Sequence, residues 1–284
     1  MTDLTAPMPV PASPSRRKLP VFVVLLLVAF TTIWPMLFVF MTSVRPKVDY
    51  LKNPYGLPSD WTFNNFVVLV ENYDVLRAAA NSLFVISGAL GVVLVFATLA
   101  AYAIVKLDVP FKAFFMGSFV SVMLVPGQVL IIPIYLMLSS LRLVDNHFGV
   151  MLVYVASNLP FATFFMITTM RAVPDQLIES ARLDGAGVFR ILWSVVVPVM
   201  RTSILTLAVL TFLGMWNELI YALILLPSEQ LNMLTPKIAS IGNRFNSNPP
   251  VLMAGLVITS LPPVLILAFL SKYLVDGLSS GMGK

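Results

Sequence analysis

The residues that could do chemistry gather in residues 171–201, a polar stretch between long apolar runs. Its charged side chains are Arg171, Asp175, Glu179, Arg182, Asp184, Arg190 and Arg201. Pro174 suits the first helical position, and Asp175 puts negative charge in the first turn, where the helix dipole favours it. Gly185 suits the C′ position that ends such a helix, because glycine adopts positive φ at little cost. A helix of about ten residues is roughly 15 Å long, too short to cross a bilayer.

Apolar residues organise both halves of this stretch. Leu177, Ile178 and Ala181 would line one face of the short helix, at spacings of one, three and four residues. A second apolar run, residues 188–197, is expected to stop at Pro198. From these residues alone, a solvated connecting loop that contains some helix explains the stretch as well as a docking element does.

The spacing within the loop resembles the EAA motif of ABC-importer permeases. Gly185 follows Glu179-Ser180-Ala181 by four residues, and Val195-Ser-Val197-Pro198 ends the pattern. Ser180 stands where the family has its first Ala, and valines replace the usual Ile and Leu. The resemblance implies a coupling helix that docks on a separate ATPase subunit. The residues implied in that contact are Glu179, Ser180, Ala181, Asp184, Gly185, Ala186 and Pro198.

The composition indicates an integral membrane protein. Of the 284 residues, 58% are hydrophobic and 11% are charged, whereas globular proteins carry about 25% charged residues. The chain has no cysteine, which excludes a disulfide framework and a thiolate metal site. The net charge of +5 fits loops rich in Lys and Arg on the cytoplasmic side of a membrane rather than a nucleic-acid partner.

Six apolar runs predict an all-α membrane protein with six transmembrane helices. Residues 1–18, which are rich in proline, are expected to form a disordered cytoplasmic tail, and residues 19–284 the membrane domain. The runs cover residues 19–44, 78–105, 113–141, 148–170, 202–226 and 245–271, each longer than the roughly 20 residues that a span needs. With both termini in the cytoplasm, eleven Lys and Arg lie inside and seven outside, as the positive-inside rule favours. Residues 171–201 then face the cytoplasm.

The family resemblance extends over about residues 20–284. It includes Asn81-Ser82-Leu83, Ala101-Tyr102-Ala103, Leu143-Val144-Asp145 and Trp216-Asn217-Glu218, which are similar to the sugar-uptake branch, as is Asp184-Gly185-Ala186 in the loop. The resemblance implies the type I ABC-importer permease fold in a bacterial inner membrane, and a sugar or polyol as substrate. It also implies a second permease, two ATPase subunits and an extracytoplasmic solute-binding protein as partners.

The chain carries no motif for ATP hydrolysis. The phosphate loop G-x-x-x-x-G-K-[ST] is absent from the sequence, so ATP and magnesium are expected to bind the partner ATPase, with no cofactor, metal or catalytic residue in this chain. Membrane lipid is an expected partner and nucleic acid is not.

Glu218 is the one acid in the middle of an apolar run. A charge at mid-bilayer costs about 2.5–3.5 kcal/mol, so it should face a partner or a wet cavity. Trp216, Asn217 and Glu218 could therefore line the translocation path, or they could make structural hydrogen bonds inside the bundle. Two other functions stay open: import of a different solute, and a proton-coupled secondary carrier that uses Glu218. The EAA-like loop has no role in such a carrier. The sole histidine, His147, is expected to be an ordinary residue at the outer membrane surface.

Overall fold

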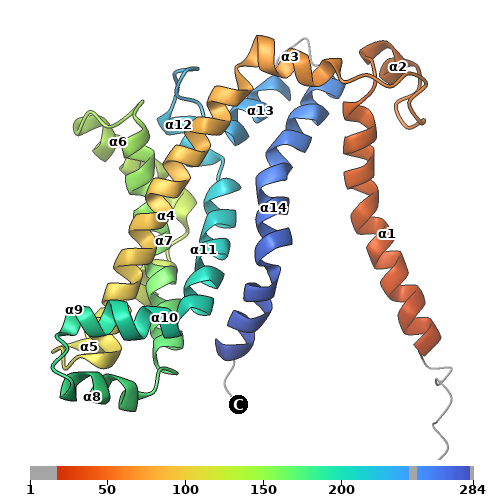
Figure 1. Cartoon of the computed structure of the whole chain (residues 1–284). Helices are drawn as coiled ribbons and strands as arrows, with labels where there is room; N and C mark the ends of the chain where they lie inside the picture. Colours follow the sequence, from red (N-terminus) through yellow and green to blue (C-terminus); the bar gives the residue numbers. More distant parts are fainter. Residues whose placement is uncertain (1–17, 243–247, 282–284) are drawn as a thin grey trace, which may run out of the picture.

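Helices joined by turns and loops form the part of the chain that is described, residues 18–242 and 248–281, in a computed structural model (Figure 1). No strand occurs within those ranges. In the same ranges, four helices are each long and apolar enough to cross a membrane: α1 (Lys18–Ser43), α4 (Val75–Lys106), α7 (His147–Met170) and α14 (Pro249–Gly281). The tail expected in residues 1–18 lies outside the described residues except for Lys18, as does the start of the run at residue 245.

Up to two further spans are formed by bent helix pairs among the described residues. The first consists of α5 (Lys112–Met123), the 3₁₀ turn η1 (Gly127–Leu130) and α6 (Ile131–Ser140), and it bends by 86°. Pro126, in extended backbone just before η1, explains the break, because proline lacks the N–H that a continuing helix needs. Within the described residues, the expected six spans compare with four continuous helices and up to two bent pairs, of which the second joins residues 188–199 of the loop to the first part of the run at residues 202–226.

The second bend, of 77°, separates α9 (Val188–Ile191), η2 (Leu192–Val196) and α10 (Val197–Val199) from α11 (Arg201–Trp216). The apolar run at residues 202–226 is itself divided, since α11 ends at Trp216 and α12 (Ile220–Leu225) begins after three residues. Apolar composition marked this run as one span, but it does not reveal where the backbone leaves the helix.

Short helices occupy opposite ends of the long ones. In Figure 1, α2 (Lys47–Lys52), α3 (Asn64–Tyr73), α12 and α13 (Leu234–Gly242) lie at one end, and α8 (Asp175–Leu183), α9 and α10 lie at the other. This arrangement agrees with the alternation of sides that the six runs predict.

The core of the bundle is the long contact between α4 and α7. Small residues make it possible, because Ala89, Ala97 and Ala101 on α4 are completely buried and let the helix backbones approach closely. By contrast, α1 diverges from α14 toward its N-terminal end (Figure 1), and its side chains from Val21 to Trp34 are exposed.

Candidate functional site

The expected short helix in the central loop is present as α8, nine residues from Asp175 to Leu183. Asp175 lies in its first turn, as the sequence predicts. Pro174 is the N-cap in extended backbone (φ −63°, ψ 132°) and not the first helical residue, so the expected start was one residue too early. The missing N–H of proline costs nothing there, because the first N–H groups of a helix have no partner within it.

Gly185 ends α8 as predicted, with φ +79°. The N–H of Gly185 donates to the Arg182 carbonyl at 3.0 Å, and the N–H of Ala186 donates to the Ala181 carbonyl at 3.0 Å. These two bonds form a Schellman motif, which requires positive φ at C′. A Cβ on Gly185 would meet nothing within 4 Å. Only the backbone conformation, and no neighbour within the described chain, therefore restricts this position.

The second apolar run continues past Pro198, contrary to expectation. The helical path from Val188 runs through η2, a π-helical turn, to Val199. In this turn the Val197 N–H reaches the Leu192 carbonyl, five residues back, so the usual pairing at four residues is already interrupted where proline lacks its donor. The bend follows at Met200 (φ −88°, ψ 7°).

The loop buries one set of apolar side chains and exposes another. Ile178, Ile191, Leu192 and Val196 are at most 3% exposed and anchor the two helical segments. The expected common face is only partly formed, since Ile178 is buried and Ala181 is half-buried, but Leu177 is exposed. A one-residue step turns a helical position by about 100°, which separates Leu177 from Ile178.

The outward surface of the loop combines polar and apolar groups. Among the residues of the EAA-like motif, Glu179, Ser180, Asp184, Gly185 and Pro198 are exposed, while Ala181 and Ala186 are half-buried against the core. Large apolar side chains lie on the same loop: Leu183 is 89% exposed, Phe189 70% and Trp193 50%. Large apolar side chains that are exposed beside polar ones are common at protein interaction sites.

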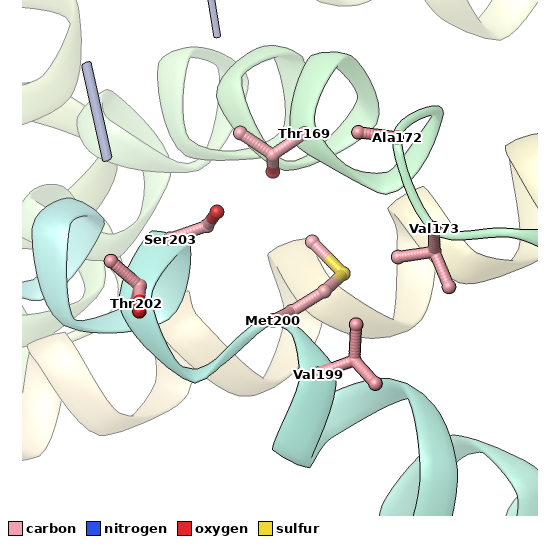
Figure 2. A pocket seen from close by; sticks show the side chains of 7 residues that line it. All are labelled: Thr169, Ala172, Val173, Val199, Met200, Thr202 and Ser203. Carbon is pink, nitrogen blue, oxygen red and sulfur yellow. The ribbon is translucent and has the colours of Figure 1, made fainter. Parts of the chain in front are cut away.

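The loop has two roots, one where it leaves α7 and one where it enters α11. A cavity of about 330 Å³ lies between them (Figure 2). Residues from both roots line it: Thr169, Ala172, Val173, Val199, Met200, Thr202 and Ser203. The Thr169 hydroxyl is satisfied within its own helix, by the carbonyls of Phe165 and Met166 at 3.2 Å each. Because open space lies between the roots, other contacts must help to fix the position of α8.

The Glu218 carboxylate caps α12. Its Oε1 accepts the N–H groups of Ile220 and Tyr221 at 2.8 and 3.0 Å, and its Oε2 accepts the Ala222 N–H at 3.3 Å and the Tyr154 hydroxyl at 3.2 Å. These bonds satisfy N–H groups that a helix start leaves unpaired. They agree with the structural alternative for Glu218.

Trp216 and Asn217 also make structural bonds. The Trp216 indole, 3% exposed, donates to the Thr259 carbonyl of α14 at 2.9 Å, and the Trp216 carbonyl accepts from the Thr235 hydroxyl of α13 at 3.0 Å. The Asn217 amide donates to the Leu213 carbonyl at 2.8 Å and is exposed. A role of these residues in the translocation path stays a prediction.

A second cavity, of about 410 Å³, lies beside the break in the first bent span. It is lined by Val122, Met123, Val125, Gly127, Leu130, Ile134, Ala156, Ser157, Pro160, Phe161 and Tyr221. The Tyr221 hydroxyl donates to the Gly127 carbonyl at 2.6 Å and so joins α12 to the break before α6. No sequence pattern marks Ser157 or Tyr221 for this site, and the nearby Pro126 is a signal for the break beside it.

The described residues contain no group of three His, Cys, Asp or Glu side chains that could hold a metal ion. His147, at the start of α7, has its Nε2 at 2.9 Å from the Leu231 carbonyl. This contact gives the imidazole an ordinary structural partner.

Comparison with known proteins matches most of the chain to one family of transport components. Residues 93–280 match the family described as binding-protein-dependent transport system inner membrane component. The chain is 27% identical to the diacetylchitobiose uptake system permease protein NgcG of Streptomyces coelicolor, over 90% of this chain and 86% of that one. It is 29% identical to the osmoprotective compounds uptake permease protein GgtD of Synechocystis, over 94% and 93%.

A solved structure shares the fold. It is a chain of a bacterial ABC transporter involved in the import of the acidic polysaccharide alginate, with a TM-score of 0.82 and 23% identity, covering 94% of this chain and 99% of that one. Because the family match spans well over half of the chain, the chain belongs to the inner membrane component family of binding-protein-dependent transport systems.

Proposed function

We propose that this chain is the permease subunit of an ATP-driven importer for a sugar or polyol, with both termini in the cytoplasm. One observation carries the proposal: a short helix with a Schellman end, α8, lies at one end of the long helices (Figure 1), and Leu183, Phe189 and Trp193 of the same loop are exposed. The names of relatives, which include uptake of diacetylchitobiose and of osmoprotective compounds, support the substrate class.

The loop is the element that contacts the ATPase. Five residues of the motif are accessible to a partner: Glu179, Ser180, Asp184, Gly185 and Pro198. The small side chains of the half-buried Ala181 and Ala186 keep the end of α8 narrow. A helix end of this shape fits a groove, with the apolar side chains as anchors and the polar ones as the rim. Two ATPase subunits, which bind ATP and magnesium, a second permease and an extracytoplasmic binding protein complete the assembly.

The 410 Å³ cavity is the candidate passage in this subunit. Its lining is mainly apolar, with the Phe161 and Tyr221 rings and a few polar groups that include the Ser157 hydroxyl. Such a combination suits a sugar, whose ring faces pack on aromatic side chains while its hydroxyls need hydrogen-bond partners. Trp216, Asn217 and Glu218 support this region by fixing α11, α12 and α14.

The test is uptake by the complete transporter in proteoliposomes, with labelled disaccharides, oligosaccharides and polyols as candidate solutes. We expect uptake that needs ATP and the binding protein and that persists with a protonophore. Uptake that survives ATP depletion and stops with a protonophore would support the proton-coupled carrier instead. The cap contacts of Glu218 already use that carboxylate for another purpose.

A further inference from the structure

The last turn of α4 holds the start of the coupling loop. The Lys106 ammonium donates to the Val173 carbonyl at 2.6 Å and to the Asp175 carboxylate at 2.7 Å. The Lys106 side chain is only 5% exposed, whereas that of Asp175 is 74% exposed. The Lys106 side chain is therefore buried beneath the loop, where it binds both Val173, in the turn between α7 and α8, and Asp175, in the first turn of α8.

Tyr102 lies one helical turn earlier, on the same face of α4. Its side chain is 3% exposed, and its hydroxyl lies 3.5 Å from the carbonyl of Val188, the first residue of α9. This contact is at the long limit for a hydrogen bond. Nevertheless, it places α4 against the segment after α8 as well as against the segment before it.

We propose that Lys106 is a positioning residue that couples α8 to the span bundle, with Tyr102 supporting the other side of the loop. This inference rests on the proposed role of α8 as the ATPase contact. A displacement of α8 by the ATPase passes through Lys106 into α4, and from α4 into α7, its long packing partner. The covalent roots of the loop alone would transmit it poorly, because they border the 330 Å³ cavity.

Lys112, another lysine at the same end of the bundle, forms an exposed ion pair that can be compared with the buried contacts of Lys106. Lys112 lies 3.8 Å from Asp108, four residues away, and both side chains are open to solvent, at 38% and 111% relative exposure. Exposed pairs of this kind contribute little. Lys106 differs in being buried and in joining two segments that are distant in sequence, so Lys112 provides a matched control.

The experiment uses the complete transporter in proteoliposomes. It compares wild type, Lys106→Gln, Lys106→Arg and Lys112→Gln by the stimulation of ATP hydrolysis by binding protein and sugar, and by sugar imported per ATP. Because Lys106→Gln removes bonds to a charged group, we expect both ratios to fall about tenfold, with basal hydrolysis and ATPase retention unchanged. Lys106→Arg should keep most of the coupling, because its guanidinium can still donate to a carbonyl and a carboxylate. Lys112→Gln should match wild type.

A structural measurement accompanies the transport assay. Hydrogen exchange of residues 172–187 should quicken in Lys106→Gln and not in Lys112→Gln, because the first variant alone releases α8 from α4. Asp175→Asn leaves the bond to the Val173 carbonyl and removes one exposed charge, so a fall of about twofold is expected.

The outcomes are separable. Wild-type coupling and wild-type exchange in assembled Lys106→Gln would overturn the inference, and so would loss of import that only parallels loss of bound ATPase. If Lys106→Gln does not reach the membrane, Asp175→Asn decides the question, and unchanged coupling and exchange in that variant count against the inference. Absence of ATP-dependent uptake by wild type would instead refute the proposed function itself.

Discussion

At the scale of single residues, Gly185 shows that a position can be set by its backbone alone. Its φ of +79° and the Schellman bonds of Gly185 and Ala186 were predictable from a glycine after an amphipathic stretch. The empty space around its Cβ position was not predictable, because it depends on how α8 stands relative to the bundle. This space makes the position a probe of the partner rather than of this chain.

Replacing Gly185 should therefore impair the ATPase contact in proportion to side-chain size. Gly185→Ala and Gly185→Leu share the same backbone cost of about 1 kcal/mol or more, so a difference between them reports the size of the side chain. Gly185→Asn tolerates positive φ and therefore adds a side chain with less of that backbone cost. We expect all three proteins to insert normally. Retention of the ATPase and uptake should be worst for Leu, and Ala should lie well above it. Co-purification of the ATPase with the tagged permease, together with uptake, measures this. Normal transport by Gly185→Leu with the ATPase bound would show that the loop only connects two helices and is not the ATPase contact.

Glu218 was identified from sequence as an exceptional charge, but its use as a cap was not. The capping contacts require α11 to end at Trp216 and α12 to start at Ile220, and a continuous apolar run hides that break. Once the break exists, a carboxylate two to four residues before the free N–H groups can satisfy them. The cost of burying the charge is then offset by these bonds.

Removal of the Glu218 cap should destabilise α12. Glu218→Leu leaves the N–H groups of Ile220, Tyr221 and Ala222 without their side-chain acceptor, and we expect a loss of about 1–3 kcal/mol. Glu218→Gln keeps an acceptor oxygen and should lose about 1 kcal/mol. Thermal unfolding in detergent and hydrogen exchange at Ile220, Tyr221 and Ala222 measure the effect, with Glu71→Gln, at an exposed carboxylate of α3, as control. Unchanged exchange in the Leu variant would contradict the capping role.

At the scale of elements, the sequence located the apolar spans but not how two of them break. Pro126 signals one break, since proline ends a helix through its missing N–H. Pro198 was expected to end the second apolar run of the loop. The helical path instead continues through Pro198 after a π turn, and the bend falls at Met200. The pairing of the first break with α12, through Tyr221 and Gly127, depends on contacts between distant segments and has no signal in sequence spacing.

The Tyr221 hydroxyl should matter for transport more than for assembly. Tyr221→Phe keeps the ring that lines the 410 Å³ cavity and removes the one donor that joins α12 to Gly127. A neutral hydrogen bond contributes about 0.5–1.5 kcal/mol, so we expect a change of about two- to tenfold in uptake, with normal amounts of complex. Tyr135→Phe, on α6, is the matched control. Equal uptake by Tyr221→Phe and wild type would show that the bond between Tyr221 and Gly127 has no role in the transport cycle.

At the scale of the whole molecule, composition was sufficient to identify a membrane protein, and six apolar runs gave the number of candidate crossings. The arrangement of the crossings could not be predicted. In the bundle, α4 and α7 pack closely through small residues, while α1 stays exposed along most of its length. The same apolar composition thus serves a buried helix and one that faces outward, because lipid and protein interior are both apolar.

The orientation of the molecule supplies the last prediction. Helices α2 and α12–α13 lie at one end of the bundle and α8 lies at the other (Figure 1), and the Lys and Arg count predicts that the α8 end faces the cytoplasm. The chain has no cysteine, so single cysteines at the exposed positions Lys52, Gln230 and Asp184 can be labelled without background. A maleimide that cannot cross membranes should label Lys52→Cys and Gln230→Cys in intact cells, and Asp184→Cys only after permeabilisation. Labelling of Asp184→Cys from outside would place α8 beyond the reach of a cytoplasmic ATPase, and the orientation and the proposed coupling would both be wrong.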